Sequence, residues 1–309
     1  MRRAASFMAL FATAPLLGGC QMALMDPKGP IGAEEKSIIL LATWLMLIVV
    51  VPVIVMTIAF AWRYRASNAK AAFTPDWEHS NLIEAVVWLV PCLIIAALAT
   101  VTWTSTHKLD PYERIVSSTK TIEVEVVSLD WKWLFIYPDL KIASVNELAF
   151  PVDAPVHFRL TSASVMNSFF IPQLGSQIYT MPGMETKLSL LANETGEYDG
   201  MSANYSGGGF SDMKFAARAM TEGEFEDWVK NVRASQNKLT KSAYRELALP
   251  SEKTPVAYYG DVELSLYHDA LNKCSDGALC RDDAMKFAMA KDASGGDPAL
   301  CTAAAPRGL

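Results

Sequence analysis

Cysteine is missing from the long central part of this 309-residue chain, with none between Leu93 and Lys273. The five cysteines lie at positions 20, 92, 274, 280 and 301, and the chain has four histidines. This spacing is not that of a disulfide framework, although it leaves open a late pair among Cys274, Cys280 and Cys301. A soft metal site in the central region would also have no thiolate ligands.

An excess of positive charge is missing as well. The formal net charge is -6 at pH 7, which argues against nucleic acid as a partner and against a polybasic membrane patch. Apolar side chains, by contrast, are abundant, because 51% of the residues are hydrophobic and the mean hydropathy is +0.17. Two long apolar runs account for these values, so they point to a membrane protein.

The N-terminus has the layout of a secretory signal. Met1-Arg2-Arg3 precedes an apolar stretch over 7–17 that is too short to span a bilayer comfortably. The stretch ends in Leu17-Gly18-Gly19-Cys20, which resembles the lipobox of bacterial lipoproteins. We therefore predict a signal peptide over 1–19, lipidation of Cys20, and a periplasmic segment over 20–37. An ordinary signal with an incidental cysteine is the alternative.

Two apolar runs, 38–61 and 82–103, are each long enough to cross a hydrocarbon core of about 30 Å. They predict a transmembrane helical hairpin over 38–103. The loop over 63–81 carries Arg63, Arg65 and Lys70, and the positive-inside rule places such a loop in the cytoplasm. An exported N-terminus requires the same orientation, so both observations place everything after Trp103 in the periplasm.

Glu84 is the unusual residue of the second span. A carboxylate inside a membrane segment costs a few kcal/mol and is a candidate functional residue. Glu84 lies close to the cytoplasmic end of the run, between Ile83 and Ala85. From the residues alone, a boundary carboxylate in contact with water is an equally good interpretation.

After the hairpin the pattern changes to strands. Apolar and polar residues alternate over 121–126, 156–161 and 187–190, with turn signals such as Met181-Pro182-Gly183 between the strands. Short strands at this spacing predict a β-sandwich or barrel within 104–220. A capping box at Thr221–Glu224 then begins a helical extension over 221–291. The tail over 292–309 is expected to be disordered.

Two segments of the predicted sandwich, 164–175 and 198–215, resemble the second subunit of haem–copper respiratory oxidases. In the branch that oxidises cytochrome c, this pattern carries a His, then Cys-x3-Cys-x3-His-x2-Met, and holds two copper ions. The equivalent positions here are Asn167, Ser202, Ser206, Phe210 and Met213. Only Met213 matches the residue type of the copper-binding pattern. The other four positions have lost the His and Cys ligands, so we expect no copper here.

Loss of these ligands is typical of the quinol-oxidising branch, so the chain resembles subunit II of cytochrome bo-type ubiquinol oxidases. The resemblance implies a membrane-anchored α+β fold: a two-helix transmembrane hairpin, a periplasmic cupredoxin-like β-sandwich without copper, and a helical C-terminal extension. It also implies a place in the bacterial cytoplasmic (inner) membrane, in a complex that oxidises ubiquinol, reduces O2 to water and pumps protons.

In such a complex this chain would carry no metal, no cofactor and no catalytic residue. The haems and copper would belong to subunit I, and the other partners would be subunits III and IV and membrane lipid. A Glu in the motif matched by Glu84 lies at the cytoplasmic mouth of a proton-uptake channel, which implies that role here. The alternatives are a cytochrome c oxidase subunit, a menaquinol oxidase subunit and a membrane-tethered periplasmic binding lipoprotein.

Three further side chains carry expectations. His157 lies on the polar side of an alternating strand and is expected to be solvated. Trp131 and Trp133 resemble the aromatic segment that relays electrons to copper in the cytochrome c branch. Without copper we expect packing for both, in the core or against subunit I.

Overall fold

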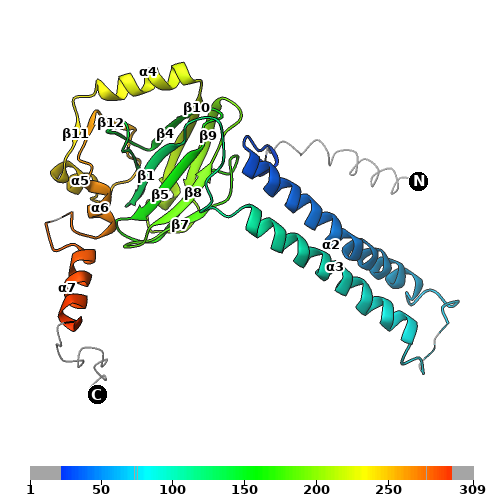
Figure 1. The fold of residues 1–309 in the computed structure, drawn as a ribbon. Helices are drawn as coiled ribbons and strands as arrows, with labels where there is room; N and C mark the ends of the chain where they lie inside the picture. The colour runs from blue at the N-terminus through cyan, green and yellow to red at the C-terminus, as the bar shows by residue number, and fades with distance from the viewer. Residues whose placement is uncertain (1–21, 73, 75, 276, 294–309) are drawn as a thin grey trace. The chain divides into compact units, whose positions relative to one another are not determined.

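The computed structural model describes residues 22–72, 74, 76–275 and 277–293. The chain divides into two compact units, Met1–Asp110 and Pro111–Leu309 (Figure 1). The predicted signal peptide, Cys20, Cys301 and the end of the predicted disordered tail lie outside the described residues.

The first unit is a helical hairpin. A 3-10 turn at Ala23–Met25 precedes helix α2 (Pro30–Arg63), and α3 (Asn81–Lys108) follows the connecting loop. Lys108 Nζ lies 2.6 Å from Glu34 Oε1, so the start of α2 and the end of α3 lie side by side. Both helices are long and apolar enough to cross a membrane, and their most apolar segments bury nothing within the chain. Apolar residues all round a helix suit lipid rather than water.

Helix α2 begins earlier than the apolar run that predicts it. Pro30 at the start supplies a preformed φ angle for the first turn, so the helix also includes residues 31–37, among them the charged residues Glu34, Glu35 and Lys36. Pro52 and Pro91 lie inside α2 and α3 respectively, and both helices continue through them.

The second unit is built on two packed sheets (Figure 1). The first has the order β12-β3-β2-β1-β5-β8 and the second β4-β10-β9-β6-β7. The strands of the first are β1 (Ile122–Leu129), β2 (Lys132–Tyr137), β3 (Ile142–Val145), β5 (Val156–Ser162), β8 (Thr186–Leu190) and β12 (Ala257–Tyr259). The strands of the second are β4 (Glu147–Pro151), β6 (Asn167–Phe170), β7 (Ile178–Thr180), β9 (Gly196–Ser202) and β10 (Lys214–Met220).

Aromatic rings fill the space between the sheets. Phe169 of β6 stacks on Phe215 of β10 at 5.1 Å between ring centres, and Trp133 of β2 meets both rings edge-on. All three side chains are almost completely buried. Aromatic pairs of this kind contribute about 0.5–1.5 kcal/mol beyond the area they bury. The packing prediction for Trp133 therefore agrees with its place in the core.

Helix α4 (Glu222–Arg233) begins the C-terminal extension with the predicted capping box. Thr221 Oγ1 accepts a hydrogen bond from Glu224 N, and the Glu224 carboxylate accepts one from Thr221 N. The buried carboxylate of Glu147 in β4 connects this extension to the sandwich. Glu147 Oε1 accepts hydrogen bonds from Trp228 Nε1 of α4 at 2.8 Å and from the Tyr258 hydroxyl of β12 at 2.7 Å. Three elements far apart in sequence therefore meet at Glu147.

The rest of the extension contains β11 (Lys238–Leu239), α5 (Lys241–Leu247), β13 (Asp261–Val262), α6 (Leu266–Leu271) and α7 (Arg281–Ala293). Side chains of the first four of these elements pack in a second apolar cluster with residues of β1, β2 and β3. Arg159 of β5 joins Glu125 and Glu185 at 2.8 Å each, and its guanidinium lies over the ring of Tyr267 in α6. A disulfide joins Cys274 to Cys280, which settles the late pairing that the sequence leaves open.

The predicted fold class is confirmed, but the expectation for His157 is wrong. His157 is only 3% exposed, and its Nδ1 lies 3.1 Å from the Ser189 hydroxyl. Strand β5 lies between β1 and β8, so Glu123 and Ser189 flank the imidazole on both sides. Burial lowers the pKa of His157 below its ordinary value. Alternation along one strand cannot show that the neighbouring strands cover its polar side.

Candidate functional site

The positions that resemble copper ligands surround the loop between β9 and β10. Asn167 begins β6, Ser202 ends β9, and Met213 lies directly before β10. The Ser202 hydroxyl donates to Asn167 Oδ1 at 3.2 Å, and Ser202 N donates to the Met213 carbonyl at 3.1 Å. The fold therefore brings these three positions together, and hydrogen bonds connect them.

Ser206 lies in the middle of this loop and is held through its main chain. Its carbonyl accepts from Trp131 Nε1 at 3.2 Å, whereas its buried hydroxyl has no partner among the described atoms. Phe210 starts a 3-10 turn (Phe210–Asp212) and packs edge-on against Tyr205. Met213 is 1% exposed and belongs to the aromatic core.

Trp131 covers the loop in an unusual backbone conformation. It is the second residue of the two-residue turn between β1 and β2, and its φ is +64°. Left-handed backbone at a bulky residue is a real outlier that the surroundings must hold in place. A Cβ on Gly209 would meet the indole at 2.5 Å, and one on Gly207 would meet it at 3.1 Å. These two glycines let the ring lie against the loop backbone.

The donor set of this loop does not fit a dinuclear copper centre. Its five positions offer a carboxamide, two hydroxyls, a phenyl ring and one thioether. Copper centres that transfer electrons need thiolate and imidazole ligands. Groups of three or more His, Cys, Asp or Glu close enough to share an ion do occur in the described residues, but all of them lie between 268 and 283.

Glu84 lies in the first turn of α3, at the beginning of the helix. Its Oε2 is 3.3 Å from Nδ1 of His79, and both side chains are more than half exposed. The second ring nitrogen of His79 contacts Asn81 Oδ1, so the imidazole bridges two oxygen acceptors. A carboxylate at this end of a helix is also favoured by the helix dipole. Glu84 therefore lies at the start of the second long apolar helix, with a titratable side chain beside it.

Two family profiles match the chain. The profile described as "Cytochrome C oxidase subunit II, periplasmic domain" matches residues 139–220, and the one described as "COX Aromatic Rich Motif" matches residues 233–278. Cytochrome bo(3) ubiquinol oxidase subunit 2 of Pseudomonas aeruginosa is 60% identical over 277 residues, which cover 88% of this chain and 84% of that protein. This chain belongs to the ubiquinol oxidase subunit 2 family.

Other relatives agree with this membership and confirm the predicted family. Ubiquinol oxidase subunit 2 of Acetobacter aceti is 52% identical, covering 87% of this chain and 88% of that protein. Quinol oxidase subunit 2 of Bacillus cereus is more distant, at 37% identity over 76% of this chain and 81% of its own. Two apolar helices and a periplasmic domain of this family indicate an inner-membrane protein.

Two side-chain pairings could not be read from the motifs of this subunit 2 family member: His79 with Glu84, and Glu147 with Trp228 and Tyr258. His79 precedes Glu84 by five residues, and its basic side chain close to a membrane carboxylate is a signal that could have found the pair. Glu147 gave no such signal, because its partners Trp228 and Tyr258 lie 81 and 111 residues away.

The close approach of Trp131 to the loop leads to a prediction about two adjacent glycines. We expect Gly209→Ala to lower the free energy of unfolding by about 1–3 kcal/mol, because its new methyl would overlap the indole. Gly208→Ala is the matched control, since a Cβ there would meet only Glu252 Oε1 at an ordinary 3.6 Å. Thermal or denaturant unfolding of both variants measures the difference, and equal stabilities would contradict the packing described for Trp131.

Proposed function

We propose that this chain is subunit 2 of a proton-pumping ubiquinol oxidase, which couples quinol oxidation to reduction of O2 to water. The observation that carries this proposal is the 60% identity to a cytochrome bo(3) ubiquinol oxidase subunit 2 over 88% of the chain. The haems, the catalytic copper and most of the quinol site belong to subunit I, and subunits III and IV complete the complex. We propose ubiquinol as the substrate because the ubiquinol oxidase subunits 2 of Pseudomonas aeruginosa and Acetobacter aceti are 60% and 52% identical to this chain, whereas the Bacillus cereus quinol oxidase subunit 2 is 37% identical.

In this complex the chain has a structural role and holds no copper of its own. Support comes from the loop chemistry: the Ser202 hydroxyl bonds to Asn167, and Phe210 packs on Tyr205. None of these groups is a soft ligand. Electrons therefore enter the complex from quinol in the membrane rather than through this periplasmic domain.

Two features of the first unit complete the proposal. The lipobox-like Leu17-Gly18-Gly19-Cys20 supports acylation of Cys20, which would add a lipid anchor to the two spans. Glu84 takes up protons from the cytoplasm for the channel in subunit I. Its place in the first turn of α3 and its pairing with His79 support this role, because a proton can reach it from water.

The test of the proposed function is purification of the complex through this chain. We expect a haem-containing partner to accompany it from solubilised membranes, and the purified complex to consume O2 with ubiquinol but not with reduced cytochrome c. Menaquinol is measured in parallel. Oxidation of cytochrome c, or a chain that purifies without any haem protein, would contradict the assignment.

A second prediction concerns the proton-entry carboxylate. Glu84→Gln removes the titratable group while keeping the size of the side chain, so we expect ubiquinol oxidase turnover to fall by at least about tenfold. Haem content and subunit composition should stay unchanged, since the exposed His79–Glu84 pair contributes little to stability. Glu78→Gln, in the loop directly before α3, is the matched control. Normal turnover of the Glu84 variant would remove this residue from proton uptake.

A further inference from the structure

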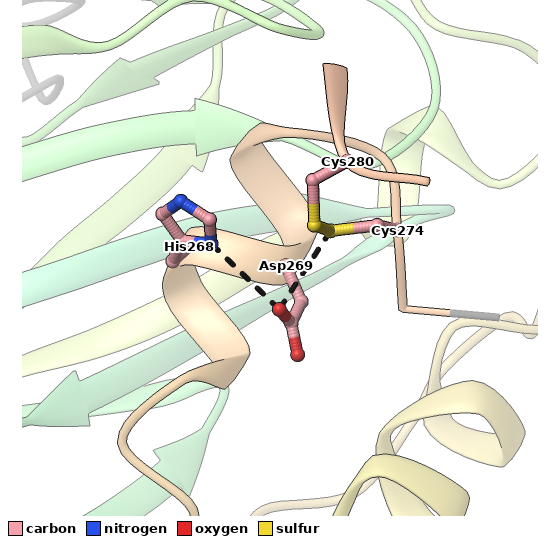
Figure 2. Close-up of side chains that lie close together, drawn as sticks. All are labelled: His268, Asp269, Cys274 and Cys280. Carbon is pink, nitrogen blue, oxygen red and sulfur yellow. Dashed lines mark hydrogen bonds and ion pairs between the residues drawn. A yellow bond between two sulfur atoms is a disulfide. The ribbon is translucent and has the colours of Figure 1, made fainter. Parts of the chain in front are cut away.

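We propose that the junction of α6 and α7 is a redox-gated zinc site, which binds Zn2+ through His268, Asp269, Cys274 and Cys280 when the two thiols are reduced. The ligand atoms of these four residues lie within 4.8 Å of one another (Figure 2). Two thiolates, an imidazole and a carboxylate are a ligand set that suits tetrahedral zinc. The site is independent of the proposed quinol oxidase function.

Two of the distances between the ligand atoms already fit tetrahedral zinc. Zinc bonds of 2.0–2.3 Å at tetrahedral angles separate neighbouring ligand atoms by roughly 3.3–3.8 Å. Asp269 Oδ1 lies 3.7 Å from Cys274 Sγ and 3.8 Å from His268 Nδ1. Figure 2 shows Asp269 between the imidazole and the two sulfur atoms, so one carboxylate oxygen faces both neighbours.

Neighbouring side chains orient two of the four ligands. His268 Nε2 lies 3.1 Å from Asp282 Oδ2, so Nδ1, which faces Asp269 Oδ1 at 3.8 Å, is the ring nitrogen on the side of the other ligands. Asp269 Oδ2 is occupied by Lys241 Nζ at 2.8 Å and by the Ser265 hydroxyl at 3.4 Å, which leaves Oδ1 for an ion. Carboxylate partners of a ligating histidine and hydrogen bonds to a ligating carboxylate are typical supports of zinc sites.

The disulfide and the metal exclude each other. In the oxidised chain Cys274 and Cys280 are bonded to one another, so neither offers a thiolate. A phosphine or dithiol reductant donates two electrons and is itself oxidised, to a phosphine oxide with oxygen from water or to a disulfide. The S–S bond breaks, and the two sulfur atoms take protons from water or from the dithiol to form two thiols. Zn2+ then replaces their protons and binds two thiolates. His268 is about half exposed, so the ion can enter from solvent.

Zinc binding to the full-length, detergent-solubilised chain tests the proposal. We expect about one zinc per chain after reduction with a phosphine, anaerobic incubation with Zn2+ and desalting, and none in the oxidised chain. Co2+ in place of zinc should give a thiolate-to-metal absorption band. The comparison of the two redox states of the unchanged chain needs no variant to fold.

Three variants locate the ion. The double variant Cys274→Ser with Cys280→Ser should lose the zinc, whereas Cys92→Ser with Cys301→Ser, the matched control, should keep it. Asp282→Asn should weaken zinc binding by about 10–100-fold, because it removes the partner of His268 Nε2. Zinc that binds equally to the oxidised chain or to the Cys274/Cys280 variant is adventitious and overturns the proposal. Absence of zinc from the reduced chain overturns it as well.

Discussion

Packing and hydrogen bonds hold the loop between β9 and β10, whose side chains include neither a thiol nor an imidazole. The Trp131 indole lies against Gly207 and Gly209 and donates to the Ser206 carbonyl. The left-handed backbone of Trp131 costs about 1–3 kcal/mol, and the contacts of the indole offset that cost. The hydrogen bond between Ser202 and Asn167 closes the base of the same loop. The indole over the backbone and the hydrogen bond at the base together hold this loop.

Hydrogen bonds and a cation–π contact also join the C-terminal extension to the sandwich. Glu147 accepts hydrogen bonds from Trp228 and Tyr258. Arg159 of the first sheet pairs with Glu185, and the Arg159 guanidinium lies over the ring of Tyr267. A buried carboxylate is stable only when charged or polar partners satisfy it. The extension therefore belongs to the folded domain, and its last helix is joined to α6 by the Cys274–Cys280 disulfide and the His268–Asp282 contact.

Patterns within short segments were enough to predict much of this structure. The two apolar runs, the capping box at Thr221 and the strand alternation each depend on neighbouring residues, and the described elements follow them. The burial of His157 was predicted wrongly because it depends on strands β1 and β8, which lie far away in sequence. The partners of Glu147, the left-handed turn at Trp131 and the choice of Cys280 as the partner of Cys274 likewise come from tertiary packing. No local pattern encodes them.

The central claim is that this cupredoxin-like domain keeps its fold without copper, so that quinol in the membrane is the source of electrons. The most direct test is the copper content of the full-length chain, separated from its partner subunits with the Cys274–Cys280 disulfide intact, after expression with abundant copper. The account predicts no stoichiometric copper on this chain. A dinuclear copper centre present in every chain, held at the loop that contains Ser202 and Ser206, would contradict it.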